Sequence, residues 1–282
     1  MSKLMTLLAG IALMLATASS ASAQYGYVYW QGFEGHNSHQ NYTQSMLQSD
    51  FPGYVWQQGM DTWRTYLSGT SKSGNYALKV SYPAYTSGTQ NSGAQFQYNL
   101  PYNGKYNELY VEYDVRFSNN FEWQGGGKLP GIGGGGFAAT GGNNANGYNG
   151  FSSRLMWRQG GRLAAYVYRA NHPSGANFGE DFYFKENGNG ADIRLQPNRW
   201  YRVKMRVHLN DVGQSNGHVA AWLDDKFVLW KGGIEWRKTN NLKIDNFMFS
   251  TFPGGGANDP YFTPTQTQSA WFDNFHLFTY SP

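Results

Sequence analysis

The 282-residue chain contains no cysteine. A disulfide framework, a thiolate metal site and a cysteine nucleophile are therefore all excluded. Charged residues make up 14% of the chain, well below the roughly 25% of an average globular protein. With so few charged helix-forming residues, a helical bundle or coiled coil is a poor fit. The formal net charge of +4 comes without runs of lysine or arginine, so we expect no nucleic-acid partner.

Apolar runs long enough to span a bilayer are also absent. Residues 4–16 form a shorter apolar stretch, Lys3 precedes it, and Ala-Ser-Ala at 21–23 matches a cleavage site. We therefore expect residues 1–23 to be a signal peptide and the mature chain, 24–282, to be secreted or periplasmic. An N-terminal membrane anchor is the alternative. No later segment has spanning length, so we expect no association of the mature chain with a membrane.

Aromatic residues (17%) and glycine (36 residues) are abundant, which suits short strands joined by glycine turns. Polar and apolar residues alternate along 107–117 and 200–209, as in strands with one buried face. No mature segment shows sustained helical periodicity. The sequence thus predicts a single all-β domain over 24–282, an antiparallel β-sandwich of the jelly-roll type. Further strands are expected over 218–223, 227–230, 242–250 and 270–280.

One segment is strongly biased in composition: 12 of the 26 residues in 125–150 are glycine, with several asparagines among them. We expect this segment to be a long loop beside a binding cleft, because long loops in compact domains usually carry function. A surface loop without a role is the alternative.

Two segments of alternating polarity, 151–158 and 162–169, flank a three-residue loop that contains two glycines. Such a loop is a common hairpin connection and sets the register of the two strands. A two-residue turn would shift the register by one and mix polar with apolar positions on each face. The predicted pairs are Arg154 with Tyr166, Ser152 with Tyr168, and Arg158 with Arg162. The opposite, apolar face would carry Leu155, Trp157, Leu163, Ala165 and Val167. A polar face without a function is the alternative.

The charge distribution around this hairpin limits the reactions and substrates that the site could support. No aspartate or glutamate lies between Glu122 and Glu180, whereas the same stretch contains one lysine and four arginines. Glycoside hydrolysis ordinarily needs two carboxyl groups, which this stretch does not supply, although carboxylates from elsewhere in the chain remain an alternative. A basic, aromatic cleft instead suits a polyanion, because opposite charge steers and holds it.

For a uronic-acid polymer, the natural cleavage reaction is β-elimination. A cation or hydrogen-bond donor neutralises the C6 carboxylate, a base removes the C5 proton, and an acid protonates the departing O4. Tyrosine suits the role of base or acid, since nearby cations favour the tyrosinate.

Five motifs follow one another along most of the mature chain: GKLPG at 127–131, SSRLMWR at 152–158, AYVY at 165–168, GHVAAWLD at 217–224 and FDNF at 272–275. In this order they resemble polysaccharide lyase family 14, which contains jelly-roll enzymes that cut alginate or glucuronan by β-elimination. The resemblance implies catalytic roles for Lys128, Arg154, Tyr166 and Tyr168, and substrate binding by Ser152. The second glycine-rich run, 133–142, departs from the family pattern and leaves the preferred polymer open.

The remaining candidates lie outside this constellation. We expect Arg158 and Arg162 to contact distal sugars of the substrate or to hold the end of the hairpin. Glu34 and Asp273, in the first and last predicted strands, are oxygen donors of the kind that bind a structural Ca²⁺ in jelly-roll carbohydrate enzymes. The chemistry itself needs no cofactor. We expect a monomer whose partner is an anionic polysaccharide.

Two classes of function therefore remain. The first is an exported lyase that acts on alginate, or next on glucuronan, and leaves 4,5-unsaturated uronate ends. The second is a carbohydrate-binding jelly-roll module that uses the same basic, aromatic face without turnover. A positioned acid and base favour the lyase, because a binding module needs neither. A glycosidase is a third alternative, weakened by the missing carboxylates.

Overall fold

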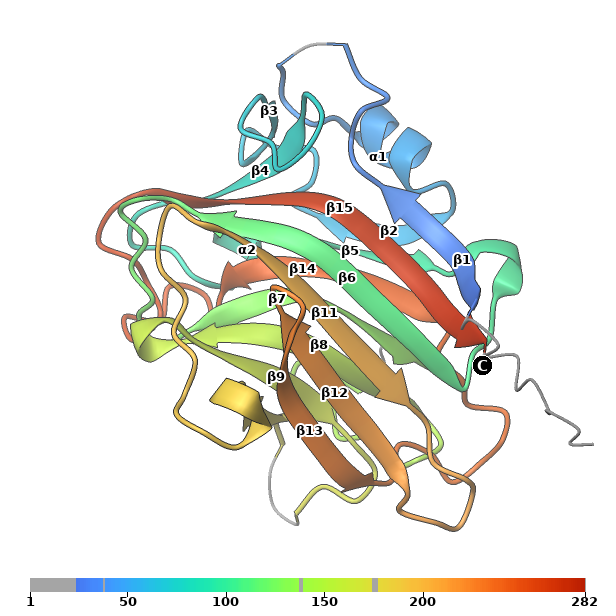
Figure 1. The fold of residues 1–282 in the computed structure, drawn as a ribbon. Helices are drawn as coiled ribbons and strands as arrows, with labels where there is room; N and C mark the ends of the chain where they lie inside the picture. Colours follow the sequence, from blue (N-terminus) through green and yellow to red (C-terminus); the bar gives the residue numbers. More distant parts are fainter. Residues whose placement is uncertain (1–23, 38, 137–138, 174–176, 282) are drawn as a thin grey trace, which may run out of the picture.

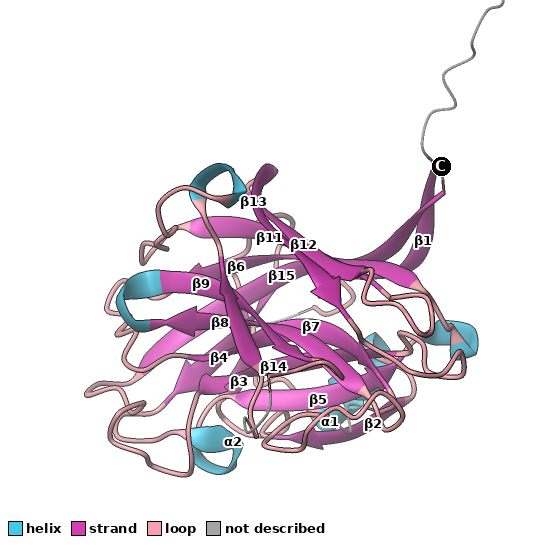
Figure 2. Cartoon of the chain, turned by 90° about the horizontal axis from the view of Figure 1, so that it is seen from below, coloured by secondary structure: helices cyan, strands magenta, loops and turns pink. Residues whose placement is uncertain are grey.

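The structure is a computed structural model that describes residues 24–37, 39–136, 139–173 and 177–281. Two antiparallel sheets pack face to face in it, as Figures 1 and 2 show from two directions. The fold is thus the predicted all-β sandwich. The predicted signal peptide, 1–23, lies outside the described residues. Within the described part of the chain, no helix is both long and apolar enough to cross a membrane.

The first sheet has eight strands in the order β13-β12-β11-β6-β15-β4-β3, with β1 paired to β15. The bounds of its strands are β1 (Gln24–Gln31), β3 (Thr65–Ser68), β4 (Ala77–Tyr82), β6 (Glu108–Phe117), β11 (Trp200–His208), β12 (Gly217–Leu223), β13 (Lys226–Ile234) and β15 (Gln268–Ser281).

The second sheet has seven strands in the order β10-β9-β8-β7-β14-β5-β2. The bounds of its strands are β2 (Tyr54–Gln58), β5 (Ala94–Asn99), β7 (Gly127–Gly134), β8 (Phe151–Arg158), β9 (Arg162–Tyr168), β10 (Glu180–Tyr183) and β14 (Asn246–Pro253).

The helices among the described residues are short and lie in connections between strands. The longest is α1, which begins after Thr43, where the Thr43 hydroxyl accepts a hydrogen bond from the Met46 backbone N–H at 3.2 Å. Their bounds are α1 (Gln44–Asp50), α2 (Gly88–Asn91), η1 (Pro101–Asn103), η2 (Gln159–Gly161) and η3 (Glu186–Gly188).

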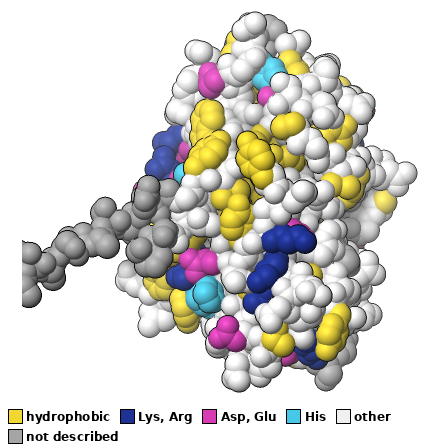
Figure 3. Space-filling view, turned by 90° about the vertical axis from the view of Figure 1, so that its right-hand side faces the viewer, with side chains coloured by type: hydrophobic (Ala, Val, Ile, Leu, Met, Phe, Trp, Pro, Cys, Tyr) yellow, Lys and Arg dark blue, Asp and Glu magenta, His cyan; other side chains and the backbone are white. Residues whose placement is uncertain are grey.

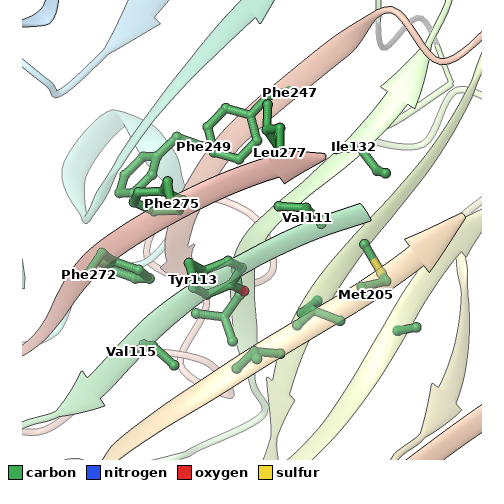
Figure 4. Close-up of a cluster of buried hydrophobic side chains, with 14 of the residues drawn as sticks. Val111, Tyr113, Val115, Ile132, Met205, Phe247, Phe249, Phe272, Phe275 and Leu277 are labelled. Carbon is green, nitrogen blue, oxygen red and sulfur yellow. The ribbon is translucent and has the colours of Figure 1, made fainter. Parts of the chain in front are cut away.

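Strand alternation builds the core between the two sheets. Along β6, Val111, Tyr113 and Val115 point into the core, where Figure 4 shows them facing aromatic side chains of β14 and β15. The charged residues that alternate with them therefore lie on the outer face of the first sheet. The prediction for 107–117 is confirmed, and so is that for 200–209, where β11 has the same alternation.

The regular alternation of strand β15 is interrupted between Asp273 and His276. Phe272 and Phe275 both lie in the core although they are three residues apart, which a regular strand does not allow. The register against β6 shifts between Asp273 and His276, and Asn274 has a φ of 51°. This is the geometry of a β-bulge, in which an extra residue bends the strand.

Two predicted elements differ from the structure. Residues 127–134, expected in a long loop, form the central strand β7 between β8 and β14. Glycine permits this close packing, since a Cβ at Gly131 would overlap the backbone oxygen of Ser153. The strand expected over 242–250 begins later, at Asn246, because Leu242 and Ile244 are buried in an irregular segment that only resembles a strand in its pattern.

Charged side chains are sparse on the surface, as the composition predicts. Figure 3 shows the side that lies to the right in Figure 1, where hydrophobic side chains gather in the upper and middle parts and a few basic side chains lie below them. The charged groups of the described residues are instead concentrated on the outer faces of the two sheets, along β6 and β11 in the first and around β8 in the second.

Candidate active site

The β8–β9 hairpin has the predicted register. Arg154 pairs with Tyr166 and Ser152 with Tyr168, and the predicted apolar face lies in the core. The neighbouring strand β7 pairs Lys128 with Met156. Because side chains alternate along each strand, three adjacent strands bring one set of polar side chains to the outer face of the second sheet. We call this set, Lys128, Arg154, Tyr166 and Tyr168, the basic face.

Arg154 is a buried cation whose hydrogen-bond partners are all uncharged. Only 3% of the residue is exposed. One terminal nitrogen donates to the Ser250 hydroxyl at 3.3 Å and lies 3.8 Å from the Met248 sulfur, and the other donates to the Thr140 hydroxyl. Within the described residues it forms no ion pair, and its Nε has no hydrogen-bond partner. A buried charge without a counterion is costly, which points to an anionic ligand.

Lys128 is placed between sulfur and an aromatic ring. Its Nζ lies 3.0 Å from the Met156 sulfur and 3.9 Å from the centre of the Tyr166 ring. Burial, together with the positive charges of Arg154 and Arg158, lowers the pKa of Lys128 well below its usual value. The physical effect is that the uncharged amine becomes the favoured form at a lower pH, which is what a base requires.

The two tyrosine hydroxyls are fixed from the opposite side by loops. Tyr166 and Tyr168 are 5% and 3% exposed, and their hydroxyl oxygens accept hydrogen bonds from the backbone N–H of Gly179 (3.1 Å) and Gly142 (3.3 Å). Burial and the hydrogen bond with Tyr168 raise the pKa of Tyr166. The sequence-based expectation that neighbouring cations favour the tyrosinate is therefore wrong for Tyr166, since burial outweighs the cations, and its hydroxyl stays protonated.

Ser152 supports this arrangement from below. Its side chain is fully buried, and its hydroxyl donates to the backbone oxygen of Ala139 at 2.9 Å. Ala139 itself packs against Met156 and the two tyrosines. The structure thus places Ser152 against Ala139, beside the two tyrosines of the basic face.

Arg158 and Arg162 lie at the far end of the hairpin. Arg158 forms an ion pair with Asp181 at 2.8 Å and lies 5.6 Å from the centre of the Tyr166 ring. Arg162 lies 3.6 Å from Asp192 and stacks over Tyr183. Arg158 therefore borders the basic face, whereas Arg162 extends away from it.

Several residues at the site were not predicted from the sequence. Asp181 stands opposite Tyr166 on β10, just after the segment without carboxylates, so the site is not carboxylate-free. Met156 lies on the same face of β8 as Arg154, so the alternation of this strand could have predicted its position. The remaining ones come from a distant strand and from loops, which no local pattern reveals: Thr140, Gly142, Gly179, Met248 and Ser250.

Glu34 and Asp273 lie away from the basic face and bind the same loop. Glu34 follows β1 rather than lying in it, and its carboxylate accepts from the backbone N–H of Asn75 and Tyr76. The Asp273 carboxylate accepts from Lys72 and Ser73 in the same way. Donors around these oxygens do not fit a cation, and the described residues contain no group of three or more acidic or histidine side chains able to hold a metal.

Comparison with known proteins identifies the family. The family model described as Polysaccharide lyase 14 matches residues 70–275. No curated protein sequence matches the chain. Among solved structures, the PL-14 alginate lyase from Aplysia kurodai is 24% identical, with 90% of this chain and 99% of that one covered and a TM-score of 0.75. Alginate lyase Aly36B is 21% identical over 90% and 97% of the two chains, with a TM-score of 0.72.

A third structure extends the comparison to another polymer. The endo-β-1,4-glucuronan lyase from the fungus Trichoderma reesei is 12% identical, covers 86% of this chain and 95% of its own, and has a TM-score of 0.54. These structures share the fold. The match of the family model over most of the chain goes further: this protein belongs to polysaccharide lyase family 14 and is a polysaccharide lyase.

Proposed function

We propose that this lyase cleaves a uronic-acid polysaccharide, alginate ahead of glucuronan, by β-elimination at the basic face. The observation that carries this proposal is the buried cation Arg154 beside the amine of Lys128. Both lie among the described residues without an ion pair to a carboxylate, next to two tyrosine hydroxyls. A polymer that carries one carboxylate on each sugar supplies the missing negative charge.

Arg154 is the group best suited to bind the C6 carboxylate. Its guanidinium is always charged and presents a fork of N–H donors that matches a carboxylate. Contacts with Ser250 and Thr140 hold this fork in place without neutralising it. Neutralising the C6 carboxylate stabilises the negative charge that develops when the C5 proton leaves.

Lys128 is the group best suited to act as base. With its pKa lowered, an uncharged amine is available to take the C5 proton. The electron pair of the C5–H bond then forms the C4=C5 double bond, and the C4–O4 bond breaks. Tyr166 or Tyr168 donates the hydroxyl proton to the departing O4, and a backbone N–H that each hydroxyl oxygen accepts holds it in position.

Relatives of known specificity support the choice of substrate. Solved structures of Aly36B variants hold an alginate tetrasaccharide and an alginate trisaccharide, at 22% identity to this chain. Alginate lyases recur among the similar structures, and a glucuronan lyase is also present. This is why we place alginate before glucuronan. We further propose that residues 1–23 direct export, so that a monomeric enzyme meets the polymer in the periplasm or outside the cell.

The proposal is tested by a substrate panel. The mature protein is incubated with alginate, glucuronan and a neutral β-glucan, and the ultraviolet absorbance of the unsaturated uronate product is followed. We expect absorbance to rise with alginate and not with the neutral glucan. Binding of alginate in a native affinity gel without any rise in absorbance would instead favour the carbohydrate-binding module.

A further inference from the structure

A polar pocket lies on the face of the molecule opposite the basic face. It has a volume of about 310 Å³ and opens on the outer face of the first sheet. Core residues of β6 lie between this face and the second sheet, so the pocket is separated from the basic face by the hydrophobic core. We call it the outer pocket; it is lined by Trp30, Lys72, Ser73, Glu112, Asp114, Arg202, Asn274 and His276.

Asp114, at the base of the outer pocket, has an unused hydrogen-bond acceptor. Only 1% of the residue is exposed. Its Oδ2 accepts from the Asn274 side-chain amide at 2.8 Å, whereas its Oδ1 has no hydrogen-bond partner in the described part of the chain. The nearest cationic nitrogen, Arg202 Nε, is 3.7 Å from Oδ1. A buried carboxylate oxygen without a donor is costly, so a ligand hydroxyl at this position would be favoured.

Trp30 forms an aromatic wall of the same pocket. Its side chain remains 45% exposed, although tryptophan is usually well buried. A Cβ at Gly32 would lie 2.6 Å from the indole ring, so the ring occupies space that only glycine leaves open. An exposed, locally fixed indole beside convergent polar groups is typical of a ligand site, and its flat apolar face suits the C–H face of a sugar ring.

Two cations border the pocket. Lys72 is exposed and has no ion pair within the described ranges, and Arg202 reaches its acidic neighbours only at 3.7 and 3.9 Å. Glu112 is balanced by Lys204 at 3.8 Å. Burial lowers the pKa of His276, which therefore stays uncharged near neutral pH. The pocket thus offers one buried acceptor, one aromatic face and two cations that lack close partners.

We propose that the outer pocket binds one uronate unit of a polysaccharide chain, independently of the basic face. Trp30 stacks against the sugar ring, Asp114 accepts from a ring hydroxyl, and Lys72 and Arg202 bind the uronate carboxylate. The identity of the sugar as a uronate rests on the proposed function. A site of this kind raises the local concentration of polymer near the enzyme and adds avidity on long chains.

The test is an NMR titration with an alginate trisaccharide. The double variant Tyr166→Phe, Tyr168→Phe is used so that the ligand is not consumed, and the indole N–H signal of Trp30 is identified by its loss in Trp30→Ala. We expect this signal to shift on titration, and Asp114→Asn to weaken the binding about tenfold, because a donor then replaces the unused acceptor. Trp63→Ala, which removes another exposed tryptophan (63% exposed), is the matched control and should leave the titration unchanged.

The outcomes separate the two proposals. A Trp30 signal that stays in place at saturating trisaccharide, while wild-type protein cleaves alginate, overturns the outer pocket and leaves the lyase intact. Shifts at Trp30 without cleavage of alginate or glucuronan support the pocket and overturn the proposed function. A neutral cellotriose that shifts Trp30 as strongly as the trisaccharide overturns the assignment of a uronate.

Discussion

The amine of Lys128 lies 3.9 Å from the centre of the Tyr166 ring, with Arg154 and Tyr166 paired directly across the β8–β9 hairpin. The candidates for base, carboxylate-binding cation and proton donor thus lie on three adjacent strands. No carboxylate forms an ion pair with Lys128 in the described part of the chain. Burial and the positive charges of Arg154 and Arg158 therefore lower the pKa of Lys128. The Asp181 carboxylate acts in the opposite direction and raises it.

The Lys128→Arg variant tests whether Lys128 acts as a base or only supplies a positive charge. Arginine keeps the positive charge but does not release a proton in a protein. If Lys128 removes the C5 proton, kcat should fall about 10²–10⁴-fold, the usual contribution of general base catalysis. In the wild type, kcat/KM should rise with pH through the lowered pKa of Lys128, because only the uncharged amine is active. A variant that retains most of its kcat would show that Lys128 only neutralises charge.

Tyr166→Phe and Tyr168→Phe remove each hydroxyl while keeping the ring. The variant that lacks the acid should lose about 10²–10⁴-fold in kcat, because the departing O4 is left without a proton. Thermal unfolding serves as the control for folding, since each ring continues to pack against Met156. Near-wild-type turnover in both single variants would contradict tyrosine as the acid.

Arg154→Lys is expected to be strongly damaging although it conserves charge. An ammonium does not reproduce the forked contact to a carboxylate, and the shorter donor also loses Ser250 and Thr140. Losing one such contact in the transition state costs about 10²–10³-fold in kcat. Steady-state kinetics on alginate provide the measurement. Unchanged kcat and KM would place the carboxylate contact elsewhere on the face.

Asp181→Asn tests the electrostatic control of Lys128. The Asp181 carboxylate raises the pKa of Lys128, so its removal should lower that pKa further. The ascending limb of the kcat/KM profile should then move to lower pH, with the chemistry otherwise retained. Loss of the Arg158 ion pair alone would alter stability or KM but not the position of this limb. If the ascending limb of the pH profile does not move, Asp181 does not control the pKa of Lys128.

Removal of calcium is expected to leave the protein unchanged. The carboxylates of Glu34 and Asp273 already accept hydrogen bonds from backbone N–H groups at 72–76. A cation would have to displace these donors. Thermal unfolding with EDTA and with added CaCl₂ should give the same Tm. A Tm that rises with calcium and falls with EDTA would show that the loop rearranges to bind the metal.

The register of the β8–β9 hairpin was predictable because two signals agreed. Alternation fixed which residues share a face, and the loop length fixed which residues pair. Strand β7 was missed for the opposite reason: its glycines carry no polarity pattern, and they are needed where Gly131 approaches Ser153. Lys128 was thus correctly expected near Arg154 but on a strand rather than a loop.

The hydrogen-bond partners of Arg154 could not be predicted from the sequence. Ser250 lies 96 residues further along the chain, and it meets Arg154 only because β14 pairs with β7. Sheet order of this kind depends on long-range pairing that no local pattern encodes. The direction of the Tyr166 pKa was also misjudged, because the sequence shows neighbouring charges but not burial.

Mass spectrometry of the products tests the central claim most directly. The mature enzyme is incubated with alginate oligosaccharides of defined length. β-Elimination breaks the C4–O4 bond without adding water, so the two product masses should sum to the mass of the substrate. Products whose masses together exceed that of the substrate by one water would show hydrolysis and contradict this account.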